Sequence, residues 1–169
     1  MGMKVSITES GAELGRSFAF AFTTAADKID LAAVSGTFEG DITVEGTILN
    51  TGRVYRLEGV IRCKKSFTCD RCLGHFVEPQ EHAFAEDFQQ SGTDDEADSE
   101  VNLFDGDVID LTELVRDTIL AAQPLRNLCR PDCRGLCPKC GADLNQGDCG
   151  CDRFVVDPRL AALQGLLKK

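Results

Sequence analysis

Apolar and polar residues alternate along much of the first ninety residues, which is typical of strands with one buried face. Between 18 and 22 the alternation places three phenylalanines on one side of the chain. From 38 to 48 it places Ile42, Val44 and Ile48 opposite a row of acidic residues and threonines. Both stretches predict strands of an antiparallel sheet that is covered on one face.

A longer alternating stretch runs from 54 to 68, and 76–88 predicts the strand that returns from it. Fourteen or so residues exceed the usual strand length, and Gly59 is a natural place for a bulge or bend that would curl the sheet toward a barrel. Cys63 falls on the apolar face, so we interpret it as a small buried hydrophobe. That face is formed by Tyr55, Leu57, Gly59, Ile61, Cys63 and Phe67.

The hydrophobic period changes to that of a helix after residue 108. Asp110 and Glu113 have the spacing of a capping box, and Pro124 ends the segment. Asp157 followed by proline predicts the start of a short terminal helix. The stripe that the first helix would lay on the sheet consists of Leu111, Leu114, Val115, Thr118, Ile119 and Ala122.

These patterns predict an α+β fold that is mainly β: a curled antiparallel sheet or partial barrel covered by one helix, with a C-terminal zinc-ribbon-like knob and a short terminal helix. We expect an antiparallel β domain with its covering helix at 1–124, a cysteine-rich segment at 125–156 and the terminal helix at 157–169. The polar segment 89–102 is interpreted as a solvated acidic loop, with an acidic binding element as the alternative.

Charge is distributed unevenly along the 169 residues. The formal net charge is −10, yet residues 86–113 hold eleven Asp or Glu and no Lys or Arg, which leaves 17 acidic against 18 basic residues elsewhere. The remainder is nearly neutral, so bulk charge does not favour tight phosphate binding. No apolar run reaches the roughly 20 residues of a membrane span, and no signal sequence is recognisable. We therefore expect a soluble cytoplasmic protein that neither binds a membrane nor enters an oxidising compartment.

Nine cysteines are the main chemical signal, and six of them fall between 129 and 151. The Cys-Pro-Lys-Cys-Gly sequence at 137–141 has the spacing and trailing glycine of a zinc knuckle. Spacing favours two sites of four sulfurs, each holding one structural Zn²⁺. The local site would be Cys137, Cys140, Cys149 and Cys151; the long-range site would be Cys69, Cys72, Cys129 and Cys133.

Other assignments of these cysteines stay open at this point. Cys133 could share an ion with Cys137 and Cys140 in an interleaved arrangement. His75, three residues past Cys72, is the substitute ligand to consider first. A disulfide framework and a redox Cys-x-x-Cys pair are the remaining alternatives.

The ordered motifs of the chain resemble the YceD family, the large ribosomal RNA subunit accumulation proteins of bacteria and plastids. The resemblance covers about 55–167 in register. It rests on Cys69-Asp-Arg-Cys72-Leu, Gly106-Asp-Val-Ile-Asp-Leu-Thr-Glu-Leu-Val-Arg, Cys129-x3-Cys133-Arg-Gly-Leu-Cys137-Pro-Lys-Cys140-Gly-Ala-Asp-Leu-Asn, Cys149-x-Cys151 and Asp157-Pro-Arg-Leu-Ala-Ala-Leu. It implies a non-enzymatic factor for large-subunit rRNA accumulation, and it carries the family's cysteines over to 69, 72, 129, 133, 137, 140, 149 and 151.

The expected partner is a ribosomal protein or a large-subunit rRNA precursor, with no small-molecule substrate. The acidic loop could hold a basic ribosomal protein, while a basic ridge could touch phosphate. The alternative is an autonomous nucleic-acid-binding zinc ribbon; catalysis is disfavoured because four-thiolate sites are closed. The candidate partner-binding residues are Arg56, Arg62, Lys64, Lys65, Arg71, Arg130, Arg134 and Lys139.

Overall fold

The computed structural model divides the chain into two compact units. The described residues are 2–8, 14–31, 34, 36–92, 101–152 and 159. The first unit comprises Met1–Phe67 and Phe76–Leu125, and the second comprises Thr68–His75 and Arg126–Lys169. The hairpin tip that carries the first Cys-x-x-Cys pair therefore belongs with the C-terminal cysteines. The predicted helix at 157–169 and most of the acidic loop, 93–100, lie outside the described residues.

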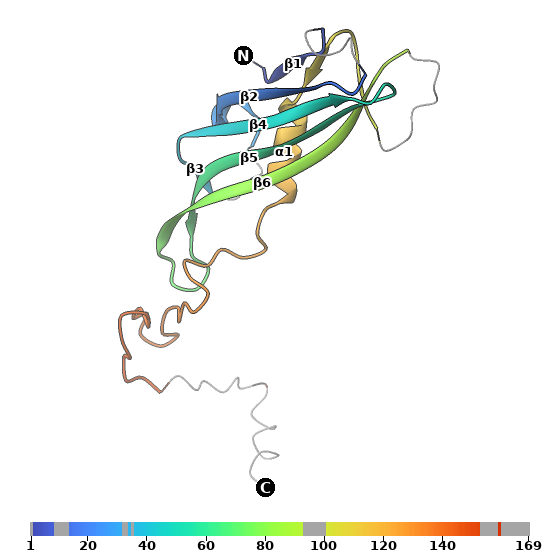
Figure 1. Ribbon diagram of the computed structural model, residues 1–169. Coiled ribbons are helices and arrows are strands. Elements are labelled where there is room, and N and C mark those ends of the chain that lie inside the picture. The colour runs from blue at the N-terminus through green and yellow to red at the C-terminus, as the bar shows by residue number, and fades with distance from the viewer. Residues whose placement is uncertain are drawn as a thin grey trace. The chain divides into compact units, whose positions relative to one another are not determined.

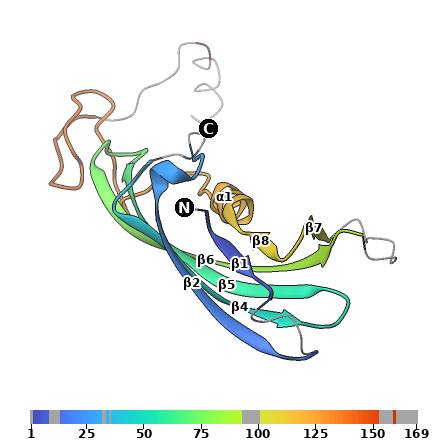
Figure 2. The same ribbon diagram turned by 90° about the horizontal axis from the view of Figure 1, so that it is seen from above.

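A curved six-stranded sheet forms the first unit (Figures 1 and 2), as the alternating patterns predicted. Its strands are β2 (Ser17–Ala25), β3 (Thr37–Phe38), β4 (Asp41–Asn50), β5 (Tyr55–Thr68), β6 (His75–Gln90) and β7 (Asn102–Phe104). The strand order is β2-β4-β5-β6-β7, and β3 pairs with β5. The pairs β2–β4, β3–β5 and β4–β5 are antiparallel, whereas β7 joins β6 in parallel. The sheet is curled but does not close into a barrel.

The covering helix lies on the concave side of the sheet, together with a two-stranded ribbon (Figure 2). The helix is α1 (Thr112–Ala121), and the ribbon pairs β1 (Lys4–Ser6) with β8 (Val108–Asp110). A short 3-10 turn, η1 (Ala26–Lys28), follows β2. Val115 and Ile119 of α1 are buried in the hydrophobic core. The strands contribute Ile42, Val44, Ile48, Leu57, Ile61 and Cys63 to the same core.

Of the bulge or bend expected at Gly59, the bulge does not form. The register of β4 with β5 runs without interruption through the pair of Gly46 and Gly59. A Cβ on Gly59 would lie 2.6 Å from the ring of Phe84 and 2.5 Å from the carbonyl oxygen of Glu45. The glycine is required because an aromatic ring covers it, and the pairing needs no extra residue.

The start of α1 differs from the capping box in detail. The Asp110 carboxylate accepts hydrogen bonds from the backbone N–H and the hydroxyl of Thr112, at 3.0 and 2.6 Å. The N-cap position is Leu111, which makes no side-chain capping bond. Asp110 thus satisfies an orphan donor of the first turn without help from Glu113. Within the described residues, no helix has the length and apolar character that a membrane crossing requires.

Candidate metal centres

A tight turn at the tip of the β5–β6 hairpin places the first cysteine pair. The Cys69 N–H donates to the Gly74 carbonyl, and the Leu73 N–H donates back to the Cys69 carbonyl, both at 2.9 Å. Leu73 adopts a positive φ of 59° to close the turn, a conformation that non-glycine residues rarely take. The turn brings the sulfurs of Cys69 and Cys72 close together, and both belong to one tetrad.

The segment after α1 is held to this hairpin tip by reciprocal hydrogen bonds. The Asp70 N–H donates to the Asn127 carbonyl at 2.9 Å, and the Asn127 N–H donates to the Asp70 carboxylate at 2.7 Å. The Arg71 guanidinium donates to the carbonyl of Cys133 at 2.8 Å. These bonds bring Cys133 and Cys129 to the tip, across more than fifty residues of chain.

The second tetrad is built locally by a knuckle. The Cys137 N–H donates to the Ala142 carbonyl at 2.8 Å, and the Gly141 N–H donates to the Cys137 carbonyl at 2.9 Å. Gly141 takes a φ of 73°, which glycine adopts without strain. Cys137, Cys140, Cys149 and Cys151 form this tetrad, and within each tetrad all sulfurs lie within 4.8 Å of one another.

The sulfur spacing of the first tetrad fits a tetrahedral metal and is too long for cystine. The Cys69 and Cys133 sulfurs lie 3.8 Å apart, and those of Cys72 and Cys129 lie 3.7 Å apart. A zinc–sulfur distance of about 2.3 Å gives about 3.8 Å between the corners of a tetrahedron. A disulfide requires about 2.05 Å, and all nine cysteines are free thiols. The grouping is the one predicted from spacing, and the interleaved arrangement does not form.

Backbone amides prepare one sulfur of each tetrad to be a thiolate. Hydrogen bonds from backbone N–H groups, led by that of Cys129, lower the pKa of Cys69 to about 6. The N–H groups of Cys140 and Lys139 do the same for Cys137, whose pKa also falls to about 6. A thiolate is the form that binds metal at neutral pH.

Another thiol in each tetrad has a raised pKa. Desolvation and the neighbouring sulfurs raise the pKa of Cys129 to about 12. The sulfurs of Cys140 and Cys149 raise the pKa of Cys151 to about 12 as well. Four negative sulfurs cannot share so small a volume without a cation between them. The donor set therefore fits a divalent, thiophilic ion such as Zn²⁺.

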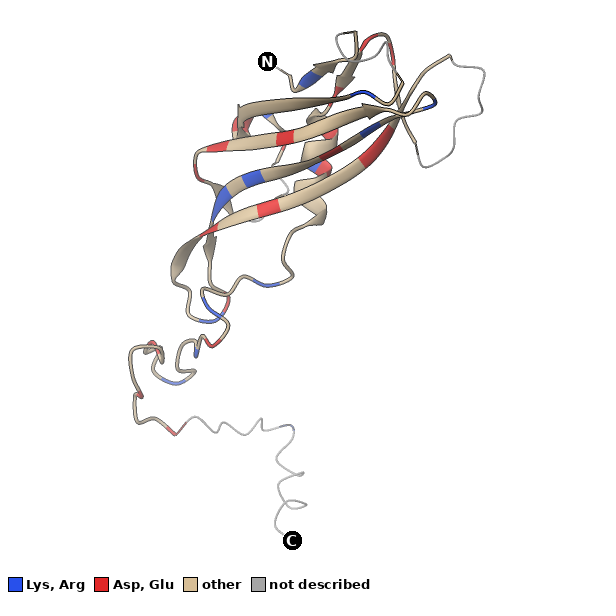
Figure 3. Cartoon of the chain, viewed as in Figure 1, with Lys and Arg blue, Asp and Glu red and all other residues tan. Residues whose placement is uncertain are grey.

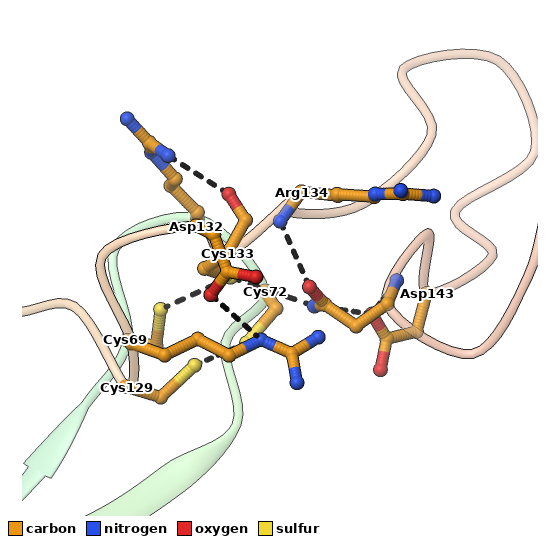
Figure 4. A network of polar contacts seen from close by, with 10 residues as sticks. Cys69, Cys72, Cys129, Asp132, Cys133, Arg134 and Asp143 are labelled. Carbon is orange, nitrogen blue, oxygen red and sulfur yellow. Dashed lines mark hydrogen bonds and ion pairs between the residues drawn. The ribbon is translucent and has the colours of Figure 1, made fainter.

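A polar network joins the first tetrad to the loop that follows Cys140 (Figure 4). The Asn145 side-chain amide donates to the Cys133 sulfur at 3.4 Å and to the Asp143 carboxylate at 2.7 Å. The Asn145 side-chain carbonyl accepts from the Arg134 N–H at 2.8 Å. The loop of the second tetrad thus orients a sulfur of the first. Sequence reasoning alone gives Asn145 no role; the available signal is its place in the Gly-Ala-Asp-Leu-Asn run after Cys140.

His75 is not a ligand in this arrangement. Its Nδ1 lies 3.3 Å from the hydroxyl of Thr68. Within the described part of the chain, the groups of metal-ligating side chains are the two cysteine tetrads alone. Cys63 stays apart from both: it is 5% exposed, and burial raises the pKa of its thiol. The interpretation of Cys63 as a buried hydrophobe is confirmed.

The basic residues of the sheet are largely neutralised by acidic neighbours (Figure 3). Arg56 makes a two-pronged ion pair with Asp87, at 2.7 and 2.8 Å. Arg62 contacts Glu45 and Glu81 on the two flanking strands, at 2.7 and 2.9 Å. These two members of the basic ridge predicted from the sequence are therefore paired with carboxylates. The other members are exposed: Lys64 on β5, and Arg71, Arg130, Arg134 and Lys139 in the second unit.

Lys65 does not lie on this surface, so its inclusion in the basic ridge was wrong. Its residue is 1% exposed, and its Nζ lies 5.2 Å from the centroid of the Phe38 ring and 4.9 Å from that of Phe67. Burial lowers the pKa of Lys65. The residue shares the inward face of β5 with Cys63, and two aromatic rings take the place of water around its charge.

Comparison with known proteins identifies the family. The family model described as "Large ribosomal RNA subunit accumulation protein YceD" matches residues 57–167. The chain belongs to the YceD family. The matched range holds all eight tetrad cysteines and α1. No solved structure matches the chain.

Relatives that are similar to this chain come from bacteria and plants. "Uncharacterized protein YlbN" of Bacillus subtilis is 35% identical over 105 residues, covering 60% of this chain and 59% of that protein. "Uncharacterized protein Rv2926c" of Mycobacterium tuberculosis is 35% identical over 102 residues, covering 59% and 49%. A maize protein named "Large ribosomal RNA subunit accumulation protein YCED homolog 1, chloroplastic" is 28% identical over 148 residues, covering 67% and 49%. The chain thus spans about half to three fifths of the length of these relatives.

Proposed function

We propose that this protein is a non-enzymatic factor of ribosome biogenesis that supports the accumulation of large-subunit ribosomal RNA. It would act by binding a ribosomal protein or a precursor of the large subunit. The observation that carries the proposal is the family match over 57–167, which includes the whole metal-binding framework. The names of the family and of the maize relative supply the link to large-subunit rRNA.

In this proposal the two tetrads are structural. Cys69, Cys72, Cys129 and Cys133 would hold one Zn²⁺, and Cys137, Cys140, Cys149 and Cys151 the other. Bound zinc would supply a cross-link between segments of chain. A four-thiolate set leaves no open coordination position for a substrate or water, so it supports a scaffold and not a catalyst.

The charge pattern favours a protein partner over bare RNA. Arg56 and Arg62 are already paired with carboxylates. Each filled tetrad would add a net charge of −2 to the second unit. By sequence that unit, 68–75 and 126–169, holds nine Lys or Arg against six Asp, so its formal net charge would fall from +3 to −1 once both ions are bound.

The proposal is tested in a bacterial host that lacks its own YceD family member. The chain is supplied as wild type, as Cys72→Ser, or as the matched control Cys63→Ala, which removes a cysteine outside both tetrads. We expect wild type and the control to restore the ratio of large- to small-subunit rRNA, and Cys72→Ser to fail. An unchanged rRNA ratio on deletion and on complementation would refute the function.

A further inference from the structure

The outer edge of β6 is largely without a neighbouring strand. Among the described residues, β7 pairs with β6 only where Asn102–Phe104 lie beside Phe88–Gln90. Upstream of that point the described chain contributes no strand to this edge. Pro79 has no N–H to offer, so the usable stretch runs from 80 to 87. An unpaired edge of this kind is a template for an added strand.

This edge borders a groove of 710 Å³ between β6 and α1. It is lined by residues 81–86 on the strand and by the exposed side of the helix from Leu114 to Ala122. Four of the six exposed side chains along its walls are small: Ala83 and Ala85 on β6, and Ala121 and Ala122 on α1. Small side chains leave room for a further backbone beside the strand.

The groove is acidic. Glu81, Glu86 and Asp117 line it, and an adjoining groove that shares Glu86, Leu114 and Asp117 adds Asp110 and Glu113. No Lys or Arg lines either groove. Lys4, Arg62 and Arg116 each contact one of these five carboxylates, so the surface keeps a net negative charge. The chain itself has no Lys or Arg from 81 to 115.

We infer that this groove binds an extended Lys- or Arg-rich peptide segment of a protein partner, which adds a strand to the outer edge of β6. Main-chain hydrogen bonds to the edge would provide affinity, and the carboxylates would select basic side chains. The same charge repels a nucleic-acid phosphate backbone. The inference deepens the proposed function, and it rests on that function only for the biological source of the peptide.

The test uses the full-length, zinc-loaded protein and a synthetic probe. The probe is a capped, fluorescein-labelled peptide of about eight alternating lysines and valines, a length that matches the free edge. We expect saturable binding by fluorescence anisotropy that weakens as salt rises, with slower amide exchange at 80–87 in mass spectrometry. A peptide of the same charge but N-methylated at alternate residues should bind at least about tenfold more weakly, because it lacks the strand donors.

Matched variants locate the binding surface. Ala85→Lys adds a charge to the β6 edge, and Ala21→Lys does the same on β2, which pairs with β4 alone. Asp117→Lys reverses a charge in the groove, and Asp41→Lys reverses one outside it. We expect the groove variant of each pair to lose about fivefold or more in affinity and the control to lose none, all with unchanged circular dichroism.

Several results would overturn the inference. Equal losses in both members of each pair would show nonspecific charge attraction. Binding without protection at 80–87, or equal binding of the N-methylated peptide, would exclude strand addition. An oligouridine that protects 80–87 in place of the peptide would assign the groove to RNA. None of these results bears on the rRNA ratio, so the proposed function would be judged separately.

Discussion

Loss of the long-range tetrad should weaken the protein more than loss of the local one. Cys72 and Cys129 are 57 residues apart in the chain, and the loop between them contains β6, β7, β8 and α1. Cross-linking a loop of that length restricts the unfolded chain by up to about 4 kcal/mol, against about 3 kcal/mol for a loop of roughly 14 residues such as 137–151. Cys72→Ser is therefore expected to lower the free energy of unfolding of the sheet by an amount approaching the larger value.

Cys140→Ser is the comparison, because it opens only the local tetrad. Urea unfolding followed by far-ultraviolet circular dichroism measures the stability of the sheet, and amide exchange separates 57–63 on β5 from 136–144 in the second unit. We expect Cys72→Ser to shift the urea midpoint and to speed exchange in both regions. Cys140→Ser should speed exchange only at 136–144. If both variants unfolded at the parental urea concentration, the tetrads would not contribute to folding and the reasoning would fail.

Three further predictions concern the first unit. Gly59→Ala should cost about 1 to 3 kcal/mol in urea unfolding, because its Cβ would meet the Phe84 ring, whereas the Cβ of Gly2→Ala would meet first the flexible Lys4 side chain, at 3.3 Å. Lys65→Met should raise the unfolding free energy by about 1 kcal/mol by removing a buried charge, and a decrease would show that its aromatic contacts dominate. Arg56 lowers the pKa of Asp87, so their ion pair stabilises the fold fully at pH values above the unfolded-state pKa of Asp. This stabilisation is lost as pH falls through the lower folded-state pKa. Arg56→Gln should therefore make the free energy of unfolding depend less on pH in that range.

The strands and the helix could be predicted because their hydrophobic periods depend on local sequence alone. The alternation in β4 and β5 and the stripe of α1 directly determine which faces are buried. The bulge proposed at Gly59 was wrong because one reason for this glycine lies on another strand, where Phe84 covers it. Lys65 was misplaced for a similar reason: its charge suggested a surface, while Phe38 and Phe67 come together only in the fold.

The grouping of the cysteines into two tetrads was predictable because cysteine spacing limits which sulfurs can meet. The hydrogen bonds that orient them were not. Asn145 acts on Cys133 through a loop whose path depends on the second tetrad. Asp70 and Asn127 exchange bonds across 57 residues. Such contacts depend on tertiary structure, and no local pattern marks them.

The central claim is that two structural zinc sites, each formed by four cysteines, stabilise a protein that acts by binding a partner. Native mass spectrometry of freshly purified, reduced protein tests it most directly. We expect a mass that includes two Zn²⁺ ions per chain, falling to one in Cys140→Ser and remaining two in Cys63→Ala. A parental mass with no metal, or one lower by the hydrogens lost in forming disulfides, would contradict the account.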